Sequence, residues 1–133
     1  MRKIARIAFA AAVATLLVAS SALSPDALAR PRYSATRFFD GLWSVTIVTR
    51  SGDCNQAYRY PLRIWDGRVY KADNDPNYNV GGAVARNGAI AVTVAGNGET
   101  AQGVGRLRRN AGGGIWHTTN GECSGQWTAE RRG

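Results

Sequence analysis

The sequence has 133 residues, a formal net charge of +8 at pH 7, and hydrophobic residues at 44% of its positions. This length leaves room for one small domain and excludes a multidomain enzyme. The chain has one His and two Cys residues, and no nucleophile and base stand in a recognisable catalytic motif. The sequence therefore argues against an enzyme.

Residues 1–29 are typical of a signal peptide. Basic residues at the start precede an apolar run over residues 7–19, and the small residues of Ala27-Leu28-Ala29 follow. The run is too short to span a bilayer as a mature helix, and no later stretch is apolar enough to do so. The sequence predicts a periplasmic or secreted protein with no transmembrane span after cleavage.

Cleavage would leave 133 − 29 = 104 residues, beginning at Arg30, with 14 basic and 8 acidic side chains and a net charge of +6. Residues 30–38 are basic and irregular, which predicts a flexible tail before a domain over residues 39–133. A domain of this size buries only about 60–65% of its unfolded surface. It therefore benefits from a covalent staple.

The domain has the side-chain pattern of an all-β protein. Apolar and polar residues alternate over residues 41–50 and again over residues 124–130, as expected for strands with one wet face. Seven turn signals divide the domain into eight segments at a spacing typical of a barrel or sandwich. The signals lie at residues 51–53, 66–67, 73–77, 87–88, 96–98, 110–112 and 120–121.

The two cysteines connect the first and last segments. Cys54 follows the first predicted strand and Cys123 precedes the last, so antiparallel neighbours would bring both to one rim within disulfide reach. A meander whose first and last strands pair is a closed barrel. We therefore expect an eight-stranded antiparallel up-and-down barrel closed by this disulfide, with a two-sheet β-sandwich as the alternative.

Gly41-Leu42-Trp43 at the start of the first strand resembles the GxW element of calycins, the lipocalin and avidin-like barrels. The resemblance implies that Trp43 plugs one end of the barrel beneath an arginine from the last strand, here Arg131 or Arg132. Gly-x-Trp occurs again at residues 114–116 and 125–127, where Gly leaves room beside a packed indole. The chain is also similar to small periplasmic inhibitors of proteases and lysozymes, and to short exported proteins of alphaproteobacteria.

Two features weakly suggest chemistry. His117 is predicted to face outward, because it alternates with Trp116, and a solitary exposed His is usually incidental. Asp73 to Asn77 has the spacing that opens a calcium loop, but Tyr78 and Val84 stand where an EF-hand needs Gly and Glu. We expect this segment to be a turn, and we expect no metal, cofactor or catalytic residue.

The interior offers a candidate ligand site. Its aromatic residues would line a cavity with polar handles for one small apolar molecule. The candidates are Trp43, Tyr58, Tyr60, Tyr78, Trp116 and Trp127. Because strands of about five to seven residues enclose little space, we expect these side chains to fill the barrel, with a hollow interior as the alternative.

The positive charge offers a second candidate site. A patch of arginines would attract an anionic envelope component or an acidic protein, whereas nucleic acid is scarce after export. The patch comprises Arg106, Arg108, Arg109, Arg131 and Arg132; the plainer interpretation is a solvated exterior. The sequence favours a non-enzymatic module that binds a protein or envelope partner, for example as an inhibitor. Its alternatives are a calycin-like carrier of a small apolar ligand and an envelope-stabilising protein without a specific ligand.

Overall fold

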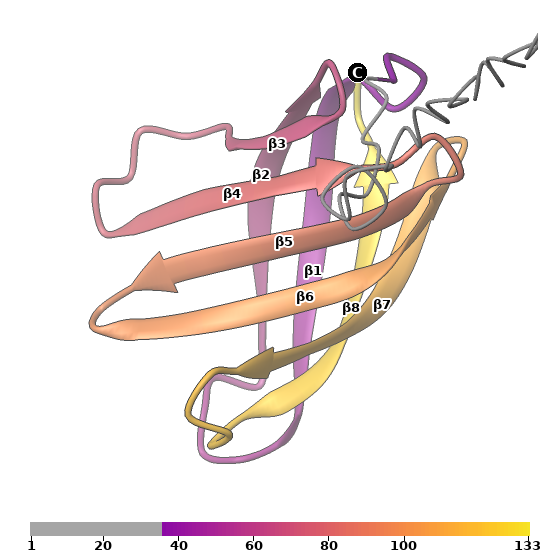
Figure 1. The fold of residues 1–133 in the computed structure, drawn as a ribbon. Coiled ribbons are helices and arrows are strands. Elements are labelled where there is room, and N and C mark those ends of the chain that lie inside the picture. The colour runs from indigo at the N-terminus through magenta and orange to yellow at the C-terminus, as the bar shows by residue number, and fades with distance from the viewer. Residues whose placement is uncertain (1–35) are drawn as a thin grey trace, which may run out of the picture. The chain divides into compact units, whose positions relative to one another are not determined.

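The computed structural model describes residues 36–133. The predicted signal peptide and most of the predicted tail lie outside these residues. The described chain contains eight strands, which pair antiparallel in sequence order and close into a barrel (Figure 1). They are β1 (Gly41–Ser51), β2 (Ala57–Trp65), β3 (Arg68–Lys71), β4 (Tyr78–Val84), β5 (Ala89–Gly96), β6 (Glu99–Arg108), β7 (Ala111–Thr118) and β8 (Ser124–Arg131).

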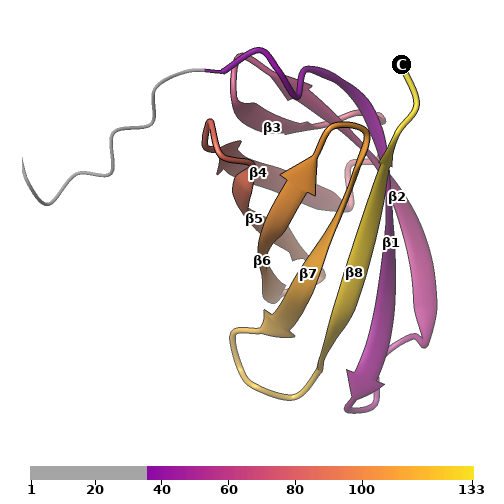
Figure 2. The same ribbon diagram turned by 90° about the vertical axis from the view of Figure 1, so that its right-hand side faces the viewer.

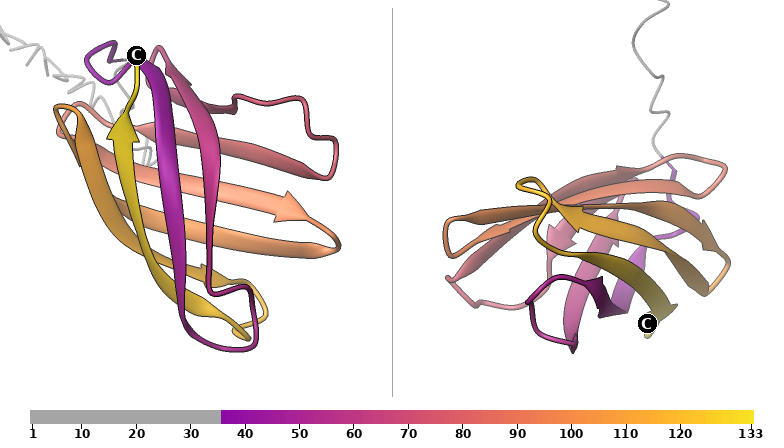
Figure 3. Two further views of the ribbon diagram at one scale, coloured as in Figure 1. Left: turned by 180° about the vertical axis from the view of Figure 1, so that it is seen from behind. Right: turned by 90° about the horizontal axis from the view of Figure 1, so that it is seen from below.

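The barrel is formed by two groups of strands that cross at a steep angle. Strands β1, β2 and β8 run side by side, and β4, β5 and β6 cross behind them (Figure 3). Each strand turns every second side chain inward, as in β1, where Trp43 and Val45 are buried. The predicted alternation is thus confirmed, and all eight strands contribute to one interior.

The first and last strands pair as the cysteines predict. The β1–β8 register runs from Trp43↔Arg131 to Thr49↔Gly125 and, after a bulge, ends at Ser51↔Ser124. Beyond it, the Cys54–Cys123 disulfide joins the β1–β2 loop to the β7–β8 loop, with 6.3 Å between the Cα atoms. Both loops lie at the same end of the barrel (Figure 2). The closed barrel with its disulfide is therefore confirmed, and the sandwich alternative is wrong.

The barrel has one weak seam, between β3 and β4. These strands share the single register pair Arg68↔Ala83, whereas β4 and β5 pair from Tyr78↔Gly96 to Val84↔Ile90. Side chains span the gap beyond that pair. The Lys71 ammonium donates to the carbonyl oxygens of Tyr78, at 2.9 Å, and of Asp75.

The end where β1 begins and β8 ends is closed by packed side chains, and we call it the closed end. Trp43 lies at its centre, only 2% exposed, with Phe39 beside it. The indole N–H donates to the Phe39 carbonyl at 2.9 Å. Other nearly solvent-free residues there are Ile64, Val69, Val84 and Leu107.

Arg131 covers Trp43 at the closed end. Its guanidinium carbon lies 5.0 Å from the indole centroid, and it donates to the carbonyls of Asp40, Phe38 and Arg109 at 2.7–2.9 Å. This is the arrangement that the resemblance to calycins implied for Arg131. The arginine ties three separate segments together over the plug, because its donors are fixed in a planar fork.

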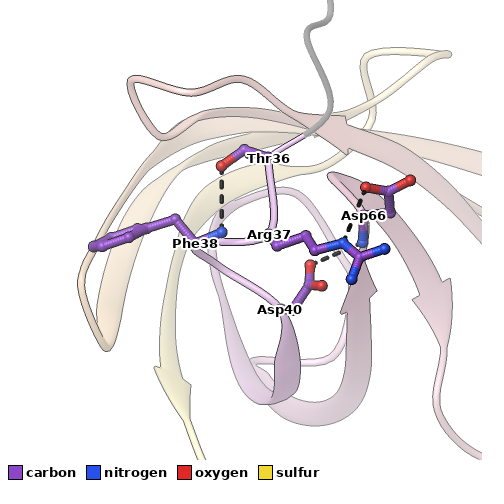
Figure 4. A network of polar contacts seen from close by, with 5 residues as sticks. All are labelled: Thr36, Arg37, Phe38, Asp40 and Asp66. Atoms are coloured by element: carbon purple, nitrogen blue, oxygen red, sulfur yellow. Dashed lines mark hydrogen bonds and ion pairs between the residues drawn. The ribbon is translucent and has the colours of Figure 1, made fainter.

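The segment before β1 lies across the same end (Figure 4). The Thr36 hydroxyl accepts from the Phe38 amide at 3.3 Å. One Asp40 carboxylate oxygen accepts from the Asp66 amide at 2.8 Å, and the Arg37 guanidinium is 3.8 Å from the Asp66 carboxylate. These contacts anchor the entry to β1 onto the β2–β3 turn.

Two glycines make room for the inner indoles. Gly114 stands opposite Trp127, and Gly125 stands opposite Trp116 in the same β7–β8 pair. A Cβ on either glycine would lie 2.9 Å from the facing indole nitrogen and would overlap with the backbone of the next strand. The repeated Gly-x-Trp pattern therefore records close cross-strand packing, as predicted.

Candidate functional site

The barrel encloses an apolar cavity of about 90 Å³. One ordered water molecule needs only about 15 Å³, so the space is large enough for a small organic molecule. The inward side chains therefore leave part of the interior unfilled. Strands β1 and β6 have 11 and 10 residues, which makes the barrel deeper than strands of five to seven residues would allow.

The cavity wall is formed by the inward residues of the strands. Aliphatic side chains dominate it, and burial decreases from the closed end toward the loops over residues 72–77 and 97–98, whereas Trp116 and Cys123 near the disulfide stay buried. We call the disulfide end the open end. Half-buried lining residues gather there: Ile47, Tyr58, Tyr60, Val80, Val92, Val94 and Ala101. The cavity is thus a cup with Trp43, Ile64 and Leu107 toward its floor.

Three tyrosines form a cluster at the open end. The rings of Tyr58 and Tyr60 meet edge to face at 5.0 Å between centroids, and Tyr60 lies 5.1 Å from Tyr78. Burial, with a smaller contribution from Tyr58, raises the pKa of Tyr60 to about 12. Burial, followed by the hydrogen bond to Asp73, also raises the pKa of Tyr78. Both phenols are therefore neutral over the physiological pH range.

The polar atoms around the cavity are mostly occupied. The Trp116 N–H donates to the Val48 carbonyl at 3.1 Å, and the Trp127 N–H to the Val104 and Ile115 carbonyls at 3.2 Å. With the Trp43 N–H also bonded to backbone, the three indoles offer only apolar surface. The phenol groups of Tyr58 and Tyr60 remain as polar handles for a ligand.

The rim of the cup consists of four loops, over residues 52–56, 72–77, 97–98 and 119–123. The 72–77 loop is held by what we call the latch, formed by Lys71, Asp73, Asp75 and Tyr78. Tyr78 donates to the Asp73 carboxylate at 2.6 Å, and the Lys71 ammonium lies 5.1 Å from the Tyr78 ring centroid while donating to two carbonyls. Lys71, the last residue of β3, therefore anchors the loop through the backbone carbonyls of Asp75 and Tyr78.

The remaining chemical candidates lie apart from the cup. His117 is exposed and faces outward, as predicted. Within residues 36–133, no group of three or more His, Cys, Asp or Glu side chains is arranged to hold a metal ion. In the same residues no helix is long and apolar enough to cross a membrane.

The structure brings most of the predicted ligand residues together. Trp43, Tyr58, Tyr60, Trp116 and Trp127 all line the cavity. Tyr78 contacts Tyr60 behind this wall. The predicted ligand residues were all aromatic and did not include the aliphatic residues that form much of the cavity wall, such as Val92 and Val94. Their alternation marked them as inward, but it does not distinguish a core residue from a cavity residue.

The five arginines of the predicted anionic patch do not act alike. Arg106 and Arg108 are exposed on the outer face of β6, and Arg109 lies in the β6–β7 turn. Arg131 is committed to Trp43 and three carbonyls. Arg132 pairs with Glu130 at 2.9 Å. Only the first three present guanidinium groups without such commitments.

Comparisons of the chain with protein-family models, with curated proteins and with solved structures find no match. The likeness to calycins therefore rests on the eight-stranded barrel and on the Trp43–Arg131 pair.

Proposed function

We propose that this is an exported, non-enzymatic, calycin-like protein that carries one small apolar ligand in its barrel. The observation that carries the proposal is the apolar cup, with Trp43 at its floor and the half-buried Tyr58 and Tyr60 in its wall. Ligand sites are concave, mostly apolar and furnished with few polar groups. A filled interior would instead have favoured recognition through the loops alone.

The lining indicates what such a ligand looks like. Aliphatic and indole surfaces favour an uncharged hydrocarbon or aromatic body, because a buried charge would find no partner there. Tyr58 and Tyr60 line the half-buried part of the cup, and their phenol groups supply hydrogen-bond donors. A ligand with one carbonyl or ether oxygen at its outer end would satisfy them.

Native mass spectrometry tests the proposal directly. Protein purified gently from its own host should show a native mass above its denatured mass, by the same increment in every preparation. The denatured mass also reports whether the chain begins at Arg30. Equal native and denatured masses, together with no binding of an added apolar probe, would refute a carrier.

The added probe is benzene, a small uncharged molecule whose binding is followed by the rise in melting temperature that a bound ligand causes. Val94→Trp should abolish its binding, because the indole would occupy the half-buried part of the cup that Val94 lines. Thr93→Trp is the matched control, since Thr93 is the exposed neighbour on the same strand. Equal loss in both variants would place the probe on the outer surface.

Binding of a protein or envelope partner, the function that the sequence favoured, stays a prediction. The rim loops are the surface on which such a partner would dock. An inhibitor would engage them without entering the cup, so Val94→Trp would leave its activity intact.

A further inference from the structure

The outer wall of β2 and β3 carries a feature that the cup does not use. Arg63 stands directly opposite Tyr70, and Trp65 directly opposite Arg68. These four residues alternate with the buried Leu62, Ile64 and Val69, so they all face solvent. We call this block the β2–β3 wall.

The register makes the β2–β3 wall a checkerboard of arginine and aromatic side chains. Residues opposite each other on paired strands lie about 5 Å apart. Residues separated by two positions on the same strand lie about 7 Å apart. Each aromatic residue therefore has an arginine at the neighbouring position both across the strand pair and along its own strand. A third cation flanks the block, because the Arg37 guanidinium carbon is 5.6 Å from the Trp65 ring centroid.

The β2–β3 wall is exposed to solvent, and its arginines have no acidic partners among the described residues. Trp65 is 56% and Tyr70 45% exposed, and Arg63 and Arg68 are also exposed. Across the described chain, neither Arg63 nor Arg68 forms an ion pair; the acidic residue nearest the block in sequence, Asp66, faces Arg37. The outward positions of β1 to β3 include no acidic residue. A large exposed indole among free guanidinium groups contributes little to the core and marks an interaction surface.

We propose that the β2–β3 wall binds an acidic polysaccharide, a chain of sugar rings that carries carboxylate groups. Guanidinium groups hold carboxylates through paired hydrogen bonds, and aromatic rings pack against the apolar faces of sugar rings. A sheet face suits an extended polymer better than a small molecule. This site is separate from the cup and does not depend on its ligand.

Single-stranded nucleic acid would also meet arginines and aromatic rings. The Cys54–Cys123 disulfide favours the polysaccharide, because disulfides persist in oxidising compartments outside the cytosol, where nucleic acid is scarce. An oligonucleotide therefore belongs in the test as the competing ligand.

The test is isothermal titration calorimetry with polygalacturonate, with neutral dextran and a thymidine 20-mer as comparison ligands. Arg63→Ser with Arg68→Ser should weaken polygalacturonate binding about tenfold or more. Trp65→Ala with Tyr70→Ala should weaken it about fivefold while leaving the net charge unchanged. Dextran should not bind, because it offers no carboxylate to the arginines.

Arg106→Ser with Arg108→Ser is the matched control, since it also removes two positive charges, from a wall without aromatic neighbours at the paired positions. It should weaken binding by no more than about threefold, the share due to long-range attraction. Equal loss in both arginine pairs would overturn the site, as would absent polygalacturonate binding or tighter binding of the oligonucleotide. Unchanged thermal unfolding verifies that each variant is folded, which the exposure of all six residues leads us to expect.

Discussion

The two ends of the barrel are stabilised in different ways. At the closed end, Trp43 and Leu107 are 2% exposed, and Arg131 joins three segments over the plug. At the open end, the tyrosines are packed against each other, and the strands are held by the disulfide and the latch. Under the proposed function, the packed end supplies stability and the other end supplies binding, so the cup keeps space that a fully packed core would fill.

The sharpest test of this difference compares one aromatic truncation at each end. Trp43→Ala should lower the free energy of unfolding by about 3–5 kcal/mol, as buried aromatic truncations do. Tyr58→Ala should cost less than about 1 kcal/mol, because the half-buried ring already faces a cavity. Urea denaturation followed by circular dichroism measures both. Similar losses would mean that the two ends share one core.

The next effect concerns the staple at the open end. Replacing both Cys54 and Cys123 with Ser should lower the free energy of unfolding by about 2–4 kcal/mol, since the bond closes a long loop in the unfolded chain. Wild-type protein treated with dithiothreitol should unfold at the same urea concentration as the variant. If oxidised wild type and the double variant are equally stable, the disulfide does not hold the open end.

The sequence was sufficient to predict the barrel, because its signals are local. Alternation and Asn-Gly or Asp-Gly turns specify eight strands, and two cysteines at matching rims specify which strands close the ring. These features depend on residues whose chemistry is visible in the sequence. The covering of Trp43, by contrast, was implied by the resemblance to calycins, and only the coordinates distinguish Arg131 from its neighbour Arg132.

The cavity was not predictable, because its presence depends on packing between strands that are distant in the sequence. Val92 and Val94 have the same pattern whether they touch the far wall or leave a gap, so filling depends on strand length and on how the two strand groups cross. The β2–β3 wall was missed because pairing places Arg63 beside Tyr70, and alternation alone does not give that register. The sequence analysis instead placed the anionic patch partly on β6, because Arg106, Arg108 and Arg109 are close together in the sequence.

A smaller effect is expected where indoles approach a backbone. Gly125→Ala should cost about 1–3 kcal/mol, because its methyl group would meet the Val48 carbonyl and the Trp116 nitrogen. Gly81→Ala is the matched control: a Cβ there has no neighbour within 4 Å, and the loss of backbone freedom in the unfolded chain should leave stability unchanged or slightly higher. Thermal unfolding of the two variants compares them. Equal melting temperatures would mean that the inner indoles can shift without cost.

The smallest effect is a pH dependence confined to the open end. Burial raises the pKa of Tyr60 from 10.0 to about 12, and that of Tyr78 also rises. Between about pH 10 and 12 the unfolded chain releases phenolic protons that the folded chain retains, so the free energy of unfolding should fall as the pH rises. Below pH 10 both states keep these protons, and the phenols add no pH dependence.

The control for this prediction must separate the phenols from the Lys71 ammonium, which also faces Tyr78. Tyr60→Phe keeps Lys71 and the ring packing but removes the phenol proton. The urea midpoint of this variant should therefore fall less steeply with rising pH than that of wild type between about pH 10 and 11.5. Tyr78 contributes part of the pH dependence that remains. Parallel declines would show that Tyr60 ionises equally in both states. Such a phenol would be open to water, and the cup would then be wider than its half-buried lining indicates.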